Sequence, residues 1–487
     1  MRLPDRMYAP LIIATAATLF FTLFGVAPAA AAPTFFRHTC ADILNAPTDA
    51  RCGIVVVPES RAQSEGKTIG LNVLVLPAVP GPKQTDAIFE IAGGPGQPTA
   101  DSNGLDFASI AGAAHNTRDI VLVDQRGTGG SRPLQCEIYP GSGPTRFFAP
   151  EWPTDILERC GLRLGSIADL SQYSTDNAAD DLDDVRLALG YDKVDLVGGS
   201  YGTTVALDYL RRHPAHVRAA VLDGVADVNS KGPLPFAKAS QRAIDALFSD
   251  CAADAACHNA VPNIRSEFAA VLAKLAKGPV NASVTDPLTN QKSAVQIDLP
   301  MWVSTVRYGL YDTSGASDLL KMIHAAAGGD FNPSADATAR VRGGLDGLYE
   351  GMSMSVACPE DIANIDPASI PAATNDTFFG DFRVRAQMAA CDVWPRRIVD
   401  PAFFAPVRSN APVLMLTGAL DPATPPDEAA RVQRYLPHAV NVVFPHVAHA
   451  ANTACGKKLV SAFIIAGDAR GLDATCAAQE LRPPFVL

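Results

Sequence analysis

The chain has 487 residues, of which 48% are hydrophobic and 19% charged, so it can bury a large core. Its formal net charge of -11 at pH 7 argues against nucleic acid or an anionic membrane surface as the main partner, because both repel an acidic protein. This length predicts either one large domain with an insertion or two domains.

The amino-terminal segment, residues 1–32, has the pattern of a secretory signal peptide. Arg2 and Arg6 precede an uncharged stretch whose apolar centre covers residues 11–26, and the small residues 27–32 follow. A charged start, an apolar middle and a small-residue end are typical of a segment that is removed on export. We therefore predict a signal peptide over residues 1–32 and a periplasmic or extracellular protein. The alternative is an uncleaved anchor, and only then would a membrane be a partner.

Ten cysteines, an even number, predict disulfides in a chain that is exported to an oxidising compartment. None of them forms a C-x-x-C metal or redox pattern. The sequence does not fix which cysteines pair, but pairing of nearest neighbours would close short surface loops. The neighbouring pairs are Cys40 with Cys52, Cys136 with Cys160, Cys251 with Cys257, Cys358 with Cys391, and Cys455 with Cys476.

Short apolar runs bounded by glycine or proline recur along the chain and predict β-strands. Helix-like stretches lie between several of them, notably residues 177–189 and 203–212. Strands that alternate with helices predict a mostly parallel sheet covered on both faces, which is an α/β architecture. The predicted strands are residues 53–57, 71–76, 87–91, 119–123, 194–197, 219–222, 412–416 and 440–444.

The alternation is interrupted between residues 229 and 409, where amphipathic helices, one of them over residues 341–349, and turns replace the strands. A helical insertion between two strands of a sheet is the form that a lid over a sheet-edge active site takes. We therefore predict an α/β core over residues 33–228 and 410–487, with a helical lid over residues 229–409. An independent helical domain without a role in substrate selection is the alternative.

Ser200 lies in the sequence G-G-S-Y-G, residues 198–202, between a predicted strand and a predicted helix. A strand that turns sharply into a helix through small residues exposes the central serine hydroxyl, where a base and a substrate carbonyl can reach it. The G-x-S-x-G pattern alone is weak because it also arises by chance. Its strand–turn–helix context makes Ser200 the predicted nucleophile.

A serine nucleophile needs a histidine base and a carboxylate that orients the histidine. Asp421 follows the predicted strand 412–416, and His449 follows the predicted strand 440–444. The chain order serine, aspartate, histidine is the one that α/β-hydrolases use. We predict Ser200, Asp421 and His449 as a catalytic triad.

Other interpretations of these residues remain open. His446 competes with His449 as the base, although the small neighbours of His449 favour its close approach to the serine. Zinc binding by the two histidines would lack the glutamate and the spacing of the H-E-x-x-H motif. Asp421 could be only a turn residue, as Asp-Pro often is.

An acyl-transfer site also needs backbone donors for the oxyanion. The N–H group of Tyr201, directly after the serine, is one predicted donor. Residues 93–96, G-G-P-G, follow the predicted strand 87–91 and supply the other. Proline has no N–H group, so Gly94 is a better donor than Pro95. The alternative is a glycine-proline turn without a chemical role.

Five segments in order carry a family resemblance: residues 93–96, residues 124–131 (D-Q-R-G-T-G-G-S), residues 199–203, Asp421 before Thr424-Pro425, and His449. Together they resemble the proline iminopeptidase and tripeptidyl aminopeptidase family of α/β-hydrolases, from about residue 58 to the C-terminus. The last part looks like the carboxyl-terminal domain of the secreted tripeptidyl aminopeptidases. The resemblance implies an α/β-hydrolase fold and serine exopeptidase activity with no metal and no organic cofactor. We interpret Asp124 and Arg126 as structural braces.

The chain departs from cytosolic proline iminopeptidases at Ala92, where their glycine loop usually begins with histidine, and in its long, cysteine-bearing insertion. Both differences weaken the case for strict proline specificity and fit the secreted branch of the family. Family members bind the free amino terminus of the substrate with acidic lid residues, and Glu360 and Asp361 lie in a segment that resembles that lid region. The alternative for this pair is a solvated acidic surface beside a disulfide.

Three alternative functions are compatible with this interpretation of the sequence. The first is an exported serine aminopeptidase that acts on peptides. The second is an esterase, a lipase or a hydrolase of other amides, with the same chemistry on a different substrate. The third is an exported binding protein on a hydrolase scaffold, because a fold alone does not establish a function.

Overall fold

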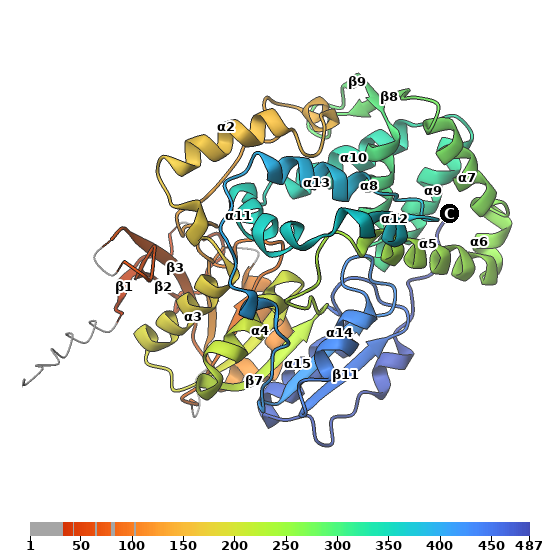
Figure 1. The fold of residues 1–487 in the computed structure, drawn as a ribbon. Helices are drawn as coiled ribbons and strands as arrows, with labels where there is room; N and C mark the ends of the chain where they lie inside the picture. Colours follow the sequence, from red (N-terminus) through yellow and green to blue (C-terminus); the bar gives the residue numbers. More distant parts are fainter. Residues whose placement is uncertain (1–32, 42, 64–65, 79–82, 102–103) are drawn as a thin grey trace, which may run out of the picture. The chain divides into compact units, whose positions relative to one another are not determined.

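The computed structural model describes residues 33–41, 43–63, 66–78, 83–101 and 104–487, so the predicted signal peptide lies outside the described residues. The described part is built on a nine-stranded sheet with the strand order β1-β2-β3-β5-β4-β6-β7-β10-β11 (Figure 1). Its strands are β1 (Phe35–His38), β2 (Arg51–Pro58), β3 (Thr68–Leu76), β4 (Ala87–Ile91), β5 (Ile120–Val123), β6 (Val194–Gly199), β7 (Val217–Asp223), β10 (Val413–Gly418) and β11 (Ala439–Phe444).

The sheet is antiparallel at its amino-terminal edge and parallel elsewhere. β1, β2, β3 and β5 pair antiparallel, whereas β5, β4, β6, β7, β10 and β11 pair parallel. Strands of the parallel part are mostly apolar because helices cover both faces of the sheet. The carboxyl ends of the parallel strands meet at one edge of the sheet, so the loops after β4, β6, β7, β10 and β11 gather there. The predicted α/β-hydrolase fold is confirmed.

Fifteen α-helices lie within the described residues. Successive residues of a strand point to opposite faces of the sheet. Leu196 belongs to the core that includes residues of α3, α4 and α14, while Val197 belongs to a second core that includes residues of α1 and α15. The helices are α1 (Phe107–Ala111), α2 (Thr154–Gly165), α3 (Thr175–Leu189), α4 (Tyr201–Arg212), α5 (Phe236–Ala253), α6 (Ala255–Ala260), α7 (Ile264–Leu275), α8 (Leu299–Gly309), α9 (Ala316–Ala327), α10 (Asn332–Leu345), α11 (Glu350–Glu360), α12 (Ile370–Thr374), α13 (Phe382–Asp392), α14 (Pro426–Gln433) and α15 (Ala454–Ala466). None of the helices in this described part combines the length and the apolar character needed to cross a bilayer.

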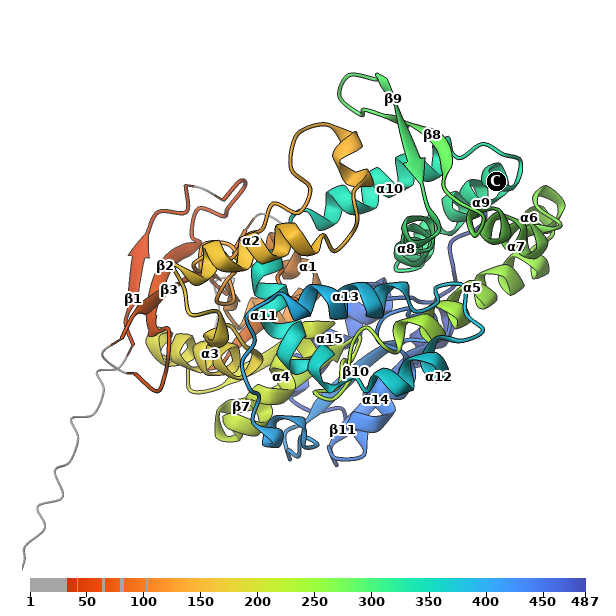
Figure 2. The same ribbon diagram turned by 45° about the horizontal axis from the view of Figure 1, so that its top comes forward.

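The segment between β7 and β10 forms a cap above the sheet in the views of Figures 1 and 2. Helices α5 to α10 share a hydrophobic core of their own around Trp302, which is fully buried. Helices α11 and α13 instead contribute Met352, Met354 and Val384 to the main core. The cap therefore has two parts, and the second is continuous with the core that supports the sheet.

Two details of the cap differ from the sequence interpretation. Residues 280–297 form an antiparallel hairpin of β8 (Val280–Thr285) and β9 (Lys292–Ile297) where helices and turns were expected. The hairpin is short and half-exposed, so its apolar pattern is weak. A helix expected around residues 341–349 is the end of α10, after which the chain turns before α11 begins.

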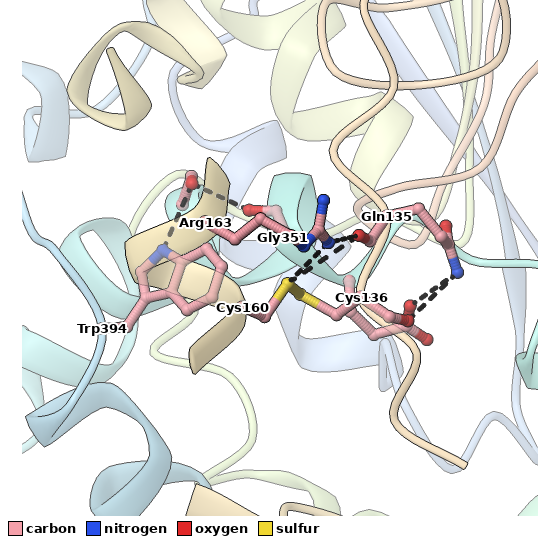
Figure 3. Close-up of a disulfide and its surroundings, with 8 residues drawn as sticks. Gln135, Cys136, Cys160, Arg163, Gly351 and Trp394 are labelled. Carbon is pink, nitrogen blue, oxygen red and sulfur yellow. Dashed lines mark hydrogen bonds between the residues drawn. A yellow bond between two sulfur atoms is a disulfide. The ribbon is translucent and has the colours of Figure 1, made fainter. Parts of the chain in front are cut away.

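Five disulfides join the nearest-neighbour cysteines, and no cysteine of the described residues is free. Figure 3 shows the bond between Cys136 and Cys160, which attaches α2 to the loop after β5. Beside it, Arg163 donates to the carbonyl of Gln135 at 2.6 Å, and Gly351 of α11 donates to the carbonyl of Leu134 at 2.8 Å. The disulfide thus lies where α2, α11 and a core loop are joined.

Gly202, the last residue of the serine motif, allows α4 to approach β4. A methyl group added at Gly202 would lie 2.0 Å from the carbonyl oxygen of Ile91, a backbone atom that cannot move away by rotating. Replacing Gly202 with Ala should therefore lower the unfolding free energy by at least about 2 kcal/mol through overpacking.

Gly344 of α10 provides the matched control, because a methyl group there meets no atom within 4 Å. Gly344→Ala should leave stability unchanged or raise it by up to about 1 kcal/mol through helix propensity. Thermal and denaturant unfolding of both variants measure the difference. Equal stability of the two variants would refute the close contact.

Candidate active site

Ser200 lies in the tight turn between β6 and α4. Its backbone has φ 54° and ψ -123°, a conformation that L-residues rarely adopt, and its N–H group donates to the carbonyl of Asp223 at 2.9 Å. Such strain persists only where the surroundings hold it, and it is found at functional turns. The turn directs the serine hydroxyl away from the sheet at the edge where the parallel strands end.

Asp421 and His449 come from the loops after β10 and β11 and meet at the same edge of the sheet. His449 Nδ1 lies 2.8 Å from Asp421 Oδ2. Asp421 is fully buried, and its carboxylate also accepts from the Ala423 and Thr424 N–H groups and from the Thr424 hydroxyl, at 2.7, 2.9 and 2.6 Å. It is therefore held as an acceptor for the imidazole rather than serving only to shape a turn. The hydrogen bond to Asp421 comes from His449 and not from His446.

The charges of this pair stabilise each other. Burial acts to raise the pKa of Asp421, but His449 and the three donors around the carboxylate lower it below the usual range. Burial acts to lower the pKa of His449, but Asp421 and, more weakly, Asp223 raise it above the usual range. Asp421 therefore stabilises the imidazolium that forms when His449 accepts a proton, as a general base requires.

Asp223 connects the serine turn with the histidine loop. Its backbone carbonyl accepts from Ser200, and its side-chain oxygens accept from the Ala451 N–H group at 2.8 and 3.0 Å. His449 Cε1 lies only 3.5 Å from the position that a Cβ atom of Gly224 would occupy. Ser200 Oγ and His449 Nε2 have no hydrogen-bond partner among the residues that the structure describes, so both remain available to each other and to a substrate. Such bonds often form only in the complex with substrate.

The glycine loop after β4 lies against the serine. A methyl group at Gly93 would lie 3.0 Å from Ser200 Cβ, and Gly94 has φ 108°, a conformation suited to glycine. The Tyr201 N–H group is at the first turn of α4, where helical N–H groups have no partner within the helix. The loop and the helix start therefore adjoin the serine, as expected for Gly94 and Tyr201.

The cap contacts all three loops of the site. His449 donates its backbone N–H to the carbonyl of Tyr311 at 3.1 Å, and the two rings pack edge to face at 4.8 Å. Arg242 of α5 donates to the carbonyl of Asp421 at 2.8 Å, and Tyr349 donates to the carbonyl of Gly96 at 3.0 Å. Residues of the predicted lid thus lie over the histidine, aspartate and glycine loops together.

Glu360 and Asp361 lie at the end of α11, close to the start of α4. Glu360 is buried and accepts from the backbone and hydroxyl of Thr175, whose hydroxyl also contacts the Tyr201 hydroxyl at 2.9 Å. Arg397 forms an ion pair with Glu360 at 3.0 Å. Asp361 is less buried and accepts from the Gly232 N–H group at 3.0 Å.

Both carboxyl groups have a raised pKa. Burial raises the pKa of Glu360 to about 7, even though Arg397 and Thr175 act to lower it. Burial and the neighbouring Glu360 raise the pKa of Asp361 to about 7. A cation placed beside the pair would relieve this repulsion.

Asp124 and Arg126 brace the neighbouring loop, as their interpretation as structural residues requires. Asp124 accepts from the Thr99, Ala100 and Gly130 N–H groups at 2.9, 2.8 and 2.8 Å. Arg126 is fully buried, donates to both carboxylate oxygens of Asp181 and reaches backbone carbonyls as well.

Sequence reasoning did not single out Asp223 or Tyr311. Asp223 follows the apolar run 219–222, and an acid directly after a parallel strand is the signal that could have identified it. Tyr311 has no such signal, since only the folding of the cap brings it to His449. Within the described residues, the histidines and carboxylates close enough to share a metal ion are at the other end of α4.

Comparisons with known proteins agree with this architecture. A family model described as alpha/beta hydrolase fold matches residues 87–273, and one described as TAP-like protein matches residues 376–476. The chain is 26% identical to the tripeptidyl aminopeptidase of Streptomyces coelicolor over 90% of this chain and 85% of that protein. It is 31% identical to serine protease Hip1 of Mycobacterium tuberculosis over 43% of each chain, so the match spans less than half of Hip1. It is 26% identical to carboxylesterase B of Mycobacterium tuberculosis over 80% of this chain and 78% of that protein.

The sheet order and the family model give the chain the α/β-hydrolase fold, and the strained turn at Ser200 has the form of the nucleophile turn of that fold. The chain is similar to a tripeptidyl aminopeptidase over most of its length, and its carboxyl-terminal region matches the TAP-like model. The resemblance noted in the sequence is confirmed.

We expect Asp223 to position the histidine loop. Because its charge raises the pKa of His449, Asp223→Asn should lower that pKa. A base works only when unprotonated, so the acidic limb of the kcat/KM profile should move to lower pH, while the plateau falls by about tenfold as the loop loosens. Asp427→Asn, which removes an exposed carboxylate of α14, should leave the profile unchanged. An unchanged profile in Asp223→Asn would contradict this role.

Proposed function

We propose that the protein is an exported serine exopeptidase that hydrolyses amide bonds near the free N-terminus of a peptide. The observation that carries the proposal is the hydrogen bond between His449 and the buried Asp421. This pair lies at the sheet edge where Ser200 follows the end of β6. The similarity to a tripeptidyl aminopeptidase and to a serine protease supports peptides as the substrate class. We further propose residues 229–409 as a lid that restricts access to this site.

The chemistry proceeds through an acyl-enzyme. His449 Nε2 removes the proton from Ser200 Oγ as that oxygen attacks the carbonyl carbon of the substrate. His449 then gives the proton to the leaving amine, the C–N bond breaks, and an ester with Ser200 remains. Water attacks this ester with His449 again as base, which releases the new carboxyl group and returns the proton to Ser200. Asp421 keeps the imidazole in the required tautomer throughout.

The oxyanion that forms during both attacks would accept hydrogen bonds from the Gly94 and Tyr201 N–H groups. The position of Gly93 and Gly94 against Ser200, and the free first turn of α4, support this assignment. Donors fixed in advance stabilise the transition state without reorganisation, which is usually a large part of the rate enhancement.

We propose that Glu360 and Asp361 bind the ammonium group of the substrate and that the two carboxylates have different roles. Glu360 is already engaged by Thr175 and Arg397, whereas Asp361 has one oxygen bonded to Gly232. Asp361 would therefore contact the amine directly, and Glu360 would stabilise it through its charge. A buried acid selects strongly for a free amine, because a substrate without one leaves that acid unpaired.

Export is part of the same proposal. Disulfides form and persist in oxidising compartments and are rare in the cytosol, so the five bonds of the chain support a periplasmic or extracellular location.

Esterase activity is the second proposed function, favoured by the similarity to carboxylesterase B over most of the chain. The same acyl-enzyme chemistry would serve an ester. The two functions differ in their need for a free amine.

The triad assignment predicts distinct results for two neighbouring histidines. Ser200→Ala and His449→Gln should each lower kcat on a tripeptide chromogenic amide by at least about a thousandfold, because nucleophile and base act as one unit. His446→Gln is the matched control and should keep near-normal turnover and labelling by a fluorophosphonate probe. Loss of activity in His446→Gln with retention in His449→Gln would reverse the assignment of the base.

Amine recognition predicts a selective effect on KM. Asp361→Asn should raise KM for substrates with a free amino terminus at least about tenfold, with a smaller change in kcat. Since the carboxyl groups lose their charge as pH falls through about 7, KM of the unmodified enzyme should rise below that pH.

Acetylated peptides and simple esters provide the comparison for this experiment, and Asp376→Asn provides a control on the exposed cap surface. An aminopeptidase should turn over acetylated peptides poorly. Equal turnover of acetylated and free peptides, with fast ester cleavage, would support the esterase and refute amine recognition.

A further inference from the structure

A group of metal-ligating side chains lies at the end of α4 that is opposite Ser200. Asp183 of α3 and His213 and His216, just after α4, place their ligand atoms within 4.8 Å of one another. We propose that these three residues form a binding site for a divalent transition metal of the zinc type. Nitrogen and carboxylate oxygen are the ligands that zinc takes in proteins, and two histidines with one carboxylate are a recurring set.

The local sequence brings the two imidazoles together. Helix α4 ends at Arg212, and Pro214 begins a single 3-10 turn (Pro214–His216) directly after His213. This turn places the rings of His213 and His216 nearly parallel, at 10°, with centroids 6.1 Å apart. Both rings therefore face Asp183 on the adjacent helix.

The contact of His213 with Asp180 makes Nδ1 the nitrogen that can bind a metal. His213 Nε2 lies 2.9 Å from Asp180 Oδ1, and Asp180 also forms ion pairs with Arg212 and Arg61. A carboxylate held by arginines is an acceptor, so the hydrogen between them belongs to Nε2, and the ring would bind a metal through Nδ1.

His213 Nδ1 lies 3.6 Å from Asp183 Oδ2. A metal ion bound to both atoms would take the place of a proton between them. A carboxylate on the far nitrogen of a metal-binding histidine, as Asp180 provides here, is also the usual way in which proteins orient such a ligand.

The remaining contacts hold Asp183 in position. Tyr209 and Arg186 donate to its Oδ1 at 2.8 and 2.7 Å, while Oδ2 accepts a longer hydrogen bond from Arg186 at 3.3 Å and is the oxygen that lies near His213 Nδ1. His216 Nδ1 lies 2.7 Å from Asp183 Oδ1, and metal binding would release the proton of this nitrogen to solvent. The charge of Arg186 opposes a cation, so we expect weaker binding than at a buried four-ligand zinc site. The partly exposed imidazoles leave room for water as a fourth ligand.

A metal here would join the end of α4 to α3 rather than take part in catalysis. Helix α4 separates the group from Ser200 by about 18 Å, from twelve residues at 1.5 Å each. A metal ion that binds only the folded state stabilises that state, and above the Kd this stabilisation increases with the logarithm of the metal concentration. The expected effect is therefore a higher unfolding temperature with unchanged turnover at room temperature.

Isothermal titration with zinc chloride on the chelator-treated full chain, purified without a histidine tag, tests the site. We expect one zinc ion per chain and a rise in Tm with zinc concentration. His213→Gln combined with His216→Gln should abolish both effects. Asp180→Asn should weaken binding by about 10- to 100-fold, because it removes the partner that orients His213.

His258→Gln, an exposed histidine of α6, is the matched control and should bind zinc like the unmodified chain. Circular dichroism of each variant separates a lost site from a lost fold. Absence of stoichiometric binding to the unmodified chain would overturn the proposal. So would binding that persists in the double histidine variant, since the ion would then lie elsewhere. Neither result bears on the serine chemistry, which is measured separately by turnover.

Discussion

The parallel alignment of β6, β7, β10 and β11 is the constraint on which the site depends. Because these strands run in the same direction, the loops after them meet at one edge, although Ser200 and His449 are far apart in the chain. Asp223 at the end of β7 strengthens this constraint, since it holds the serine turn by its carbonyl and the histidine loop by its carboxylate. The site is thus a property of the sheet edge rather than of any one loop.

The cap contributes an aromatic residue to one part of the site and two acidic residues to another. Tyr311 covers the histidine, where the leaving group would depart, while Glu360 and Asp361 lie near the start of α4. The buried acids carry raised pKa values because each is removed from water and lies beside the other. Keeping two such groups costs stability, which favours a functional reason for their presence. The same cap is joined to the main core through α11, whose Gly351 N–H group donates to the carbonyl of Leu134 near the Cys136–Cys160 disulfide.

Much of the fold could be predicted from local patterns of apolar and polar residues in the sequence. The strands around residues 87–91, 194–197 and 412–416 are mostly apolar because parallel strands are buried on both faces, and such runs can be recognised in a single sequence. The hairpin β8–β9 was missed because half-exposed strands lack such a run. The two-part packing of the cap was missed for another reason: an amphipathic helix shows which of its faces is buried, but not the element that buries it.

The sequence by itself determined the order of the motifs and predicted a sharp turn at Ser200, with Asp421 and His449 as candidate partners, because strand–turn–helix chemistry and turn residues act over a few positions. Only the tertiary structure decided that His449 rather than His446 forms a hydrogen bond with Asp421, and that Asp223 contacts both the serine turn and the histidine loop. It also decided that Glu360 forms an ion pair with Arg397, while Asp361 is less buried. It alone also brought Asp183 to His213 and His216. Each of these results depends on distances between segments far apart in the chain, and such distances are set by long-range packing rather than by local sequence.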